Sequence, residues 1–101
     1  MTIIKPVLDP YKNKKDEGKL RLDLVPPEAI EAIGETMEFG LKKGYELESW
    51  RKVEVERYRA AMMRHICNYL KNPQGKDEES NLSHTKHVLT NAAFLVALEA
   101  K

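Results

Sequence analysis

Residues 82–101, LSHTKHVLTNAAFLVALEAK, decide the fold of this chain. Polar residues open the stretch, and apolar residues then recur at helical spacing on more than one face, with Val88 on one and Phe94 on another. The pattern predicts a helix that starts near Leu82 or Ser83 and runs to the end of the stretch. A helix that is apolar on several sides lies centrally or is shared with a partner chain.

Two more helices are predicted upstream of this one. The first, over residues 27–43, starts at Pro26-Pro27 and closes at Gly44, which are typical start and stop signals. The second, roughly residues 53–71, ends at the helix breaker NPQG over residues 72–75. Three helices with short connections predict an all-α fold, a small antiparallel bundle.

Composition fits one small globular domain. The chain has 101 residues, of which 42% are hydrophobic and 33% are charged, so a single domain with a modest core is expected. Residues 1–24 are locally basic and interrupted by proline and glycine, which predicts an irregular N-terminal arm before a single helical domain over residues 25–101. The last helix carries more apolar surface than a monomer needs, so we expect oligomerisation to complete the fold as a homo-oligomer.

Several classes of protein are disfavoured by the composition. The formal net charge is +1, which argues against a dedicated binder of duplex nucleic acid. No stretch is apolar enough for a signal peptide or a membrane span, so no membrane partner and a cytoplasmic location are expected. Cys67 is the single cysteine, so no intrachain disulfide forms, and its helical setting predicts a buried thiol.

Residues around the start of the last predicted helix are candidates for chemistry. His84, His87 and Asn91 share one helix face, and two histidines one turn apart can bind a metal, a phosphate or a base edge. Asp77 and Glu79 lie in the acidic loop before this helix. They either form a solvated turn or supply oxygen ligands for Mg²⁺.

The other two predicted helices offer weaker candidates. Arg57 and Arg64 share a face of the second helix, with His65 at its edge, and this set is either an anion clamp or ordinary surface charge. Glu35 and Glu38 form an ExxE pair on the first helix, which is either a solvated face or another pair of Mg²⁺ ligands.

An ordered set of short motifs spans about residues 16–99 and resembles a known family. The motifs are GKLRLDLVPPEA at 18–29, FGLKK at 39–43, Trp50, RY at 57–58, AA at 60–61, RH at 64–65, DEES at 77–80, HTKH at 84–87 and Asn91. Together they resemble the N-terminal domain of phage dATP/dGTP diphosphohydrolases, a family that is similar to the all-helical MazG-like pyrophosphohydrolases.

The resemblance implies a reaction, a cofactor and roles for residues. The implied reaction is hydrolysis of dGTP or dATP to dNMP and pyrophosphate with Mg²⁺ or Mn²⁺, where cations and metal ions hold the phosphates. The residue roles that follow are metal binding by Asp77, Glu79, Glu35 and Glu38, catalysis by His84, His87 and Glu79, and nucleotide binding by Lys19, Arg21, Trp50, Arg57, Arg64, His65 and Asn91. Within the last group, Trp50 would stack on the purine.

The chain departs from the MazG-like pattern in one respect, and other functions therefore stay open. Glu35 and Glu38 match the ExxE half of that pattern, but HxxH replaces the expected ExxD on the last helix. The alternative function is a non-catalytic sponge, without a cofactor, that sequesters a cyclic or ADP-ribose-type signalling nucleotide of a host antiviral defence system. A third option is an accessory domain of a larger enzyme. For a phage-encoded protein, the expected location is the host cell cytoplasm.

Overall fold

The computed structural model describes residues 17–100, and the first sixteen residues of the predicted arm lie outside this range. The elements within it are η1 (Leu22–Leu24), α1 (Pro27–Lys42), η2 (Ser49–Lys52), α2 (Val55–Lys71) and α3 (His84–Glu99), where η denotes a short 3₁₀ helix. No β-strand forms in residues 17–100, although an isolated bridge pairs Lys76 with Ser83. The predicted all-α fold with three main helices is confirmed.

α1 begins and ends where its sequence signals place it. Pro26 is extended at the N-cap and Pro27 occupies the first helical position, where its fixed φ suits the helix and no amide is lost. Gly44 follows the C-cap residue with a φ of 102°. Glycine adopts this left-handed conformation without a steric penalty, so it terminates the helix sharply.

The start points of the other two helices differ slightly from the prediction. α2 begins at Val55, two residues later than expected, because Val53 is extended after the η2 turn. α3 begins at His84 with Ser83 at its N-cap. The Ser83 hydroxyl pairs with the Thr85 hydroxyl at 3.1 Å and does not cap a backbone amide.

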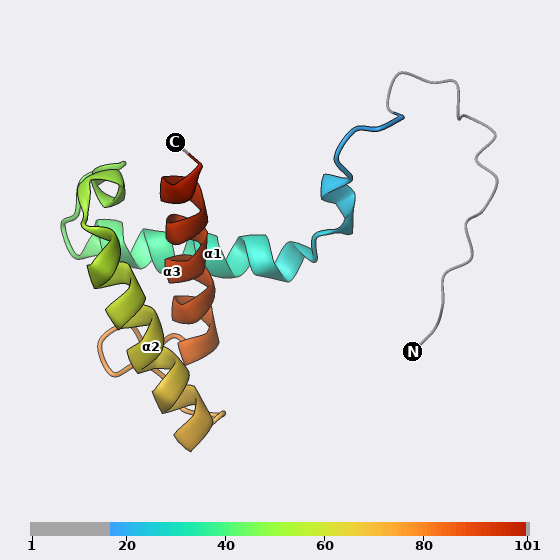
Figure 1. Cartoon of the computed structure of the whole chain (residues 1–101). Coiled ribbons are helices and arrows are strands. Elements are labelled where there is room, and N and C mark those ends of the chain that lie inside the picture. The colour runs from blue at the N-terminus through green and yellow to red at the C-terminus, as the bar shows by residue number, and fades with distance from the viewer. Residues whose placement is uncertain (1–16, 101) are drawn as a thin grey trace.

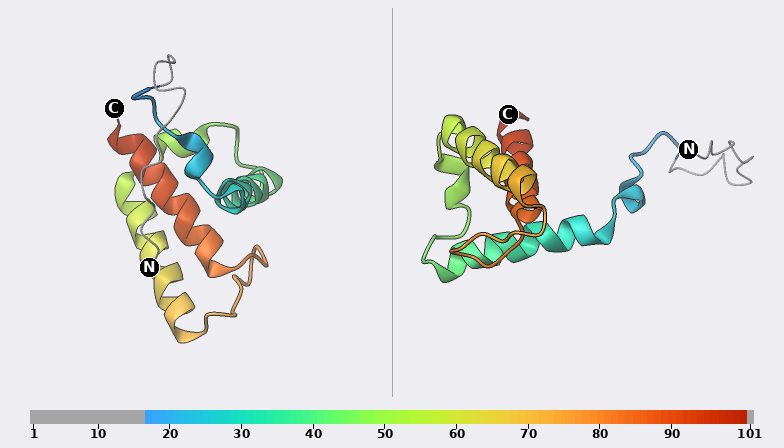
Figure 2. Two further views of the ribbon diagram at one scale, coloured as in Figure 1. Left: turned by 90° about the vertical axis from the view of Figure 1, so that its right-hand side faces the viewer. Right: turned by 90° about the horizontal axis from the view of Figure 1, so that it is seen from below.

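α2 and α3 run antiparallel and side by side, whereas α1 crosses α3 (Figure 1). α1 packs against α3 and makes no comparable contact with α2, so α3 is the central helix, as its apolar pattern predicted. The loop between α2 and α3 lies along α1, and residues 17–26, before α1, extend away from the helices (Figure 2).

The core of the described chain is thin. Ala32 is the single buried apolar residue in residues 17–100, and the buried polar residues are His84 and Thr90. An aromatic cluster of Trp50, Tyr58 and Phe94 adds to this core beside α3: the Trp50 and Phe94 rings stack at 4.7 Å between centroids, and the Tyr58 hydroxyl donates to the Trp50 carbonyl oxygen at 2.6 Å.

The prediction that Cys67 is buried is wrong: the thiol lies on an exposed face of α2. The reason is that α2 contacts α3 along one stripe only, and Cys67 falls outside it.

No helix within residues 17–100 combines the length and apolarity that crossing a bilayer requires.

Candidate functional site

Five polar side chains converge where α2, α3 and the loop between them meet, and we call them the histidine cluster. They are His65 on α2, Asp77 and Ser80 in the loop, and His84 and His87 in the first turn of α3. His84 is only 8% exposed, and the His87 side chain is 12% exposed. Polar groups buried to this degree must find partners.

The imidazole rings in the cluster contact one another directly. Nδ1 of His65 lies 2.9 Å from Nδ1 of His84, a hydrogen bond in which one ring carries the proton. The His65 ring also stacks on His87, with centroids 4.4 Å apart and planes inclined by 9°. The His65 ring therefore lies against both histidines of the predicted HxxH pair.

A hydrogen bond to Ser80 positions the ring of His87. The Ser80 hydroxyl oxygen accepts the Leu82 amide at 3.2 Å and lies 2.6 Å from Nε2 of His87. A hydroxyl can donate its proton or accept another, so the direction of this hydrogen bond follows the tautomer of His87. In either case the short contact orients the His87 ring.

The loop that carries Asp77 and Ser80 is held by its own hydrogen bonds. The Asp77 Oδ2 atom accepts the amides of Glu79 at 3.1 Å and Ser80 at 2.9 Å. The Asp77 backbone bonds to Leu82 and Asn81, each at 2.8 Å, and Asn81 takes a φ of 61° to close the turn. Short polar side chains such as asparagine tolerate this conformation. The loop is therefore preorganised.

The electrostatics of the cluster favour the neutral form of His65 and His87. Burial lowers the pKa of both His65 and His87, because desolvation disfavours the imidazolium. Burial alone would raise the pKa of Asp77, but hydrogen bonds from Ser80 outweigh it, and the net effect is a lowered pKa. Near neutral pH the cluster thus combines the neutral rings of His65 and His87 with the ionised carboxylate of Asp77.

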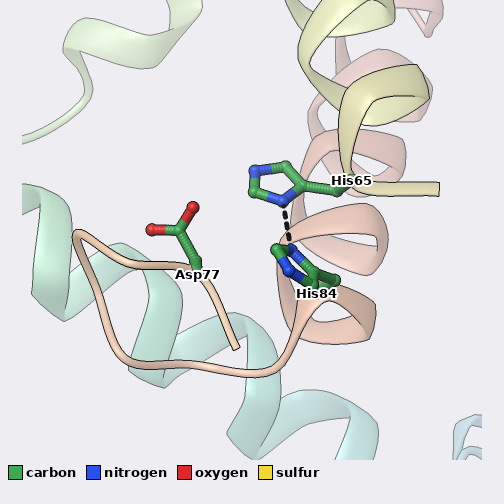
Figure 3. Close-up of side chains that lie close together, drawn as sticks. All are labelled: His65, Asp77 and His84. Carbon is green, nitrogen blue, oxygen red and sulfur yellow. Dashed lines mark hydrogen bonds between the residues drawn. The ribbon is translucent and has the colours of Figure 1, made fainter. Parts of the chain in front are cut away.

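Three members of the cluster could hold a metal ion. One donor atom from each of His65, Asp77 and His84 lies within 4.8 Å of the other two. Figure 3 shows their side chains reaching toward a common space from α2, the loop and the start of α3. Two imidazoles and one carboxylate form a ligand set that divalent metals accept in proteins.

A cleft of about 420 Å³ opens beside the cluster. The residues that line it are Asn68, Lys71, Asn72, Gly75, Lys76, Asp77, Glu78 and His84. Two lysines and two asparagine amides provide cationic and neutral donors, while Asp77 and His84 connect the cleft to the histidine cluster. His84 is also the first residue of α3, so the positive end of the α3 dipole faces this space.

Two of the other predicted metal ligands are engaged by lysines. Glu79 pairs with Lys43, and Glu35 pairs with Lys86 at 3.0 Å. Glu35 and Glu38 line a second, smaller cleft of about 190 Å³ between α1 and the loop, where Lys42 also lies. Ser80 of the histidine cluster also lines this second cleft, but neither glutamate belongs to the group of possible metal ligands His65, Asp77 and His84.

Three predicted nucleotide-binding residues engage their side chains in contacts outside the two clefts. Trp50 stacks on Phe94, and the Arg51 guanidinium lies 4.4 Å from its ring centroid. Asn91 donates to the His87 carbonyl oxygen at 2.8 Å and so acts within α3. Arg21 pairs with Asp23 through two contacts of 2.8 and 2.7 Å before α1.

Among the remaining candidates, only His65 joins the cluster. Lys19, Arg57 and Arg64 are exposed and line neither of the two clefts found in residues 17–100. Their roles toward a nucleotide stay predictions.

The structure also adds cleft residues that the sequence pattern did not single out. Lys71 ends α2, Asn72 is its C-cap and the first residue of the NPQG breaker, and Lys76 follows the breaker directly. Polar residues on both sides of a tight break are brought to one place by the reversal of the chain. The NPQG break is the sequence signal for this cleft, although by itself it predicts only the end of a helix.

Comparisons with known proteins agree with the family resemblance of the sequence motifs. The family model described as dATP/dGTP diphosphohydrolase, N-terminal, matches residues 9–101. The chain is 29% identical over 82 residues to a protein of Salmonella phage PMBT28 named dATP/dGTP diphosphohydrolase, and the match covers 81% of this chain and 28% of that protein. No solved structure shows a significant match. Because the family model covers almost the whole chain, the chain belongs to the dATP/dGTP diphosphohydrolase N-terminal family.

Proposed function

We propose that this chain hydrolyses purine deoxynucleoside triphosphates to dNMP and pyrophosphate, with a divalent metal ion, in the cleft beside the histidine cluster. The observation that carries the proposal is that side chains able to donate hydrogen bonds to phosphate line the same cleft as ionisable groups. Lys71 and Lys76 line the same cleft as Asp77 and His84. The phage relative is named for dATP and dGTP, and that name is the support for purine substrates.

The chain's own residues would bind and orient the substrate. Lys71 and Lys76 would neutralise the phosphate oxygens, and the side-chain amides of Asn68 and Asn72 would donate to phosphate or base. A cleft of about 420 Å³ lies within the 300–1,000 Å³ range common for small-molecule sites. Hydrolysis of a phosphoanhydride depends mainly on such positioning and charge neutralisation.

Proton transfer would fall to the histidine cluster. The attacking water must lose a proton, and a neutral imidazole can accept one. Burial lowers the pKa of His87 and so keeps its ring neutral near neutral pH, but its Nε2 would have to give up the hydrogen bond to Ser80 to act as a base. When bound, a divalent ion would supply charge stabilisation for the phosphates and a lowered pKa for water. Glu79 could take the catalytic and metal-binding roles predicted for it only if its carboxylate left the ion pair with Lys43.

A product assay tests this function. The protein would be incubated with each of the four dNTPs and Mg²⁺ or Mn²⁺, and dNMP and pyrophosphate would be measured by chromatography. We expect product from dGTP or dATP that EDTA abolishes. The double variant Lys71→Ala/Lys76→Ala should raise KM about tenfold or more through lost charge-assisted contacts. Lys52→Ala removes an exposed lysine of η2 outside both clefts and serves as the matched control.

The other outcomes point to the alternative functions. Tight binding of a cyclic or ADP-ribose-type nucleotide without turnover would favour the non-catalytic sponge. Activity that requires a further polypeptide would favour an accessory domain, since the chain spans only 28% of the length of the phage relative it matches.

A homo-oligomer is part of the same proposal. The observation that supports it is the thin core, together with apolar side chains left exposed before and within α1. Leu22 is 69% exposed, Leu24 is 71% exposed and Ile30 is 62% exposed. Side chains of this size usually find cover in an assembly. Sedimentation velocity at micromolar concentration should give a mass of at least two chains, and a clean monomer would refute this part.

A further inference from the structure

We propose that His65, Asp77 and His84 form a binding site for a divalent transition metal ion, such as Mn²⁺, Co²⁺ or Zn²⁺, and that Mg²⁺ binds there poorly. The site differs from the all-carboxylate ligand set that the family resemblance implies, because two of its three donors are imidazole nitrogens. Its place beside the nucleotide cleft rests on the proposed function, but its ability to bind metal does not.

The separation of the donor atoms suits one shared ion. Metal bonds to imidazole nitrogen and carboxylate oxygen are about 2.0–2.2 Å long, so two donors on one ion lie at most about 4.4 Å apart. The Nδ1 atoms of His65 and His84 are 2.9 Å apart, and all three donors lie within 4.8 Å of one another. A small rotation of the side chains brings the set within reach of one ion.

The hydrogen bond between the two histidines marks the place that an ion would take. Two nitrogens face each other at 2.9 Å, and a single proton is shared between them. Moving that proton to the Nε2 atom of its own ring leaves both Nδ1 lone pairs available and changes no net charge. A metal ion can then take the place of the proton, so loading requires a tautomer change in one ring.

Asp77 is held in a suitable orientation by the loop. Both amide hydrogen bonds to its carboxylate end on Oδ2, which leaves Oδ1 for coordination. Hydrogen bonds to a ligating carboxylate are the usual means by which proteins orient it. The stacked ring of His87 restrains His65 in the same way, at 4.4 Å between centroids.

The ligand set also indicates the class of ion. Imidazole suits Zn²⁺ and other first-row transition metals, whereas Mg²⁺ prefers oxygen ligands in octahedral geometry. Three protein ligands leave positions for water or a phosphate oxygen, which is the pattern of catalytic sites. Asp77 and His84 line the 420 Å³ cleft, so these positions would open toward the substrate space.

Metal titration of the protein stripped with EDTA tests the site without any activity assay. We expect saturable Co²⁺ binding with visible absorption bands, and weak binding of Mg²⁺. In a long-range ¹H–¹⁵N spectrum, Zn²⁺ should shift the Nδ1 signals of His65 and His84 strongly. His87, whose Nε2 is engaged by Ser80 at 2.6 Å, should shift much less.

Variants then identify the ligands. Asp77→Asn and His65→Gln should each weaken Co²⁺ binding by a factor of about 10 or more. The matched control Glu35→Gln/Glu38→Gln, in the other cleft, should bind Co²⁺ like the unmodified chain. Should a variant fail to fold, the ¹⁵N titration of the unmodified protein still decides.

Two results would overturn the site. One is the lack of saturable binding below millimolar Co²⁺ together with unshifted imidazole signals. The other is binding that survives in Asp77→Asn and His65→Gln but is lost in Glu35→Gln/Glu38→Gln. Metal binding at the site without dNTP hydrolysis would refute only the proposed function, and hydrolysis with an unshifted His65 and His84 would refute only the site.

Discussion

The loop before α3 offers the sharpest test of how the site is built, through the substitution Asp77→Ala. The carboxylate accepts two backbone amides, at 3.1 and 2.9 Å, and the side chain is only 24% exposed. Hydrogen bonds to a charged group contribute about 1.5–3 kcal/mol each, and partial exposure places these at the lower end. We therefore expect Asp77→Ala to lower the free energy of unfolding by about 2–3 kcal/mol, and Asp77→Asn by about half as much, because the amide keeps an acceptor oxygen.

Urea denaturation followed by circular dichroism measures this change, with EDTA present and protein concentration fixed so that metal and assembly do not contribute. For a domain of this size the urea dependence is about 1–2 kcal/mol per molar, so the midpoint should fall by more than about 1 M. Glu78→Ala, which removes the exposed neighbouring carboxylate, is the matched control and should move the midpoint little. Equal midpoints for Asp77→Ala and Glu78→Ala would refute the reasoning that Asp77 organises the loop.

Three further predictions concern other parts of the molecule. Phe94→Ala should cost about 2–3 kcal/mol of unfolding free energy in urea denaturation, because the half-buried ring stacks on Trp50 at 4.7 Å, and a loss below 1 kcal/mol would contradict the packing. Gly44→Ala should cost about 1 kcal/mol, seen as a lower Tm, because φ is 102° there. In EDTA, the free energy of unfolding should fall as the pH drops below 6.5, the ordinary pKa of histidine. The pKa values of His65 and His87 in the folded chain lie below 6.5, so the unfolded chain binds protons first. A Tm that stays level from pH 7.5 to 5 would oppose this last prediction.

Much of the fold could be predicted because the helix signals are local. Pro26-Pro27, Gly44 and the NPQG break set the ends of α1 and α2 to within two residues. The apolar pattern of residues 82–101 also identified α3 as central. The exposure of Cys67 could not be predicted in this way, because it depends on which stripe of α2 meets α3.

The site could be predicted only in part, for the same physical reason. Helical spacing placed His84 and His87 on one face, but the contact of His65 with both rings comes from the packing of α2 on α3. Likewise, nothing local indicates that Lys71 and Lys76 face one cleft, since the reversal of the chain brings them together. Glu35 and Glu79 matched metal-ligand patterns, yet each is paired with a lysine from another element.

A crystal structure of the protein with Mn²⁺ and a non-hydrolysable dGTP analogue would show directly whether the cleft beside the histidine cluster binds nucleotide and metal. We expect the triphosphate between Lys71 and Lys76, with an anomalous peak for manganese at His65, Asp77 and His84. A nucleotide bound instead over Arg57, Arg64 and Trp50, or a manganese ion on Glu35 and Glu38, would contradict it.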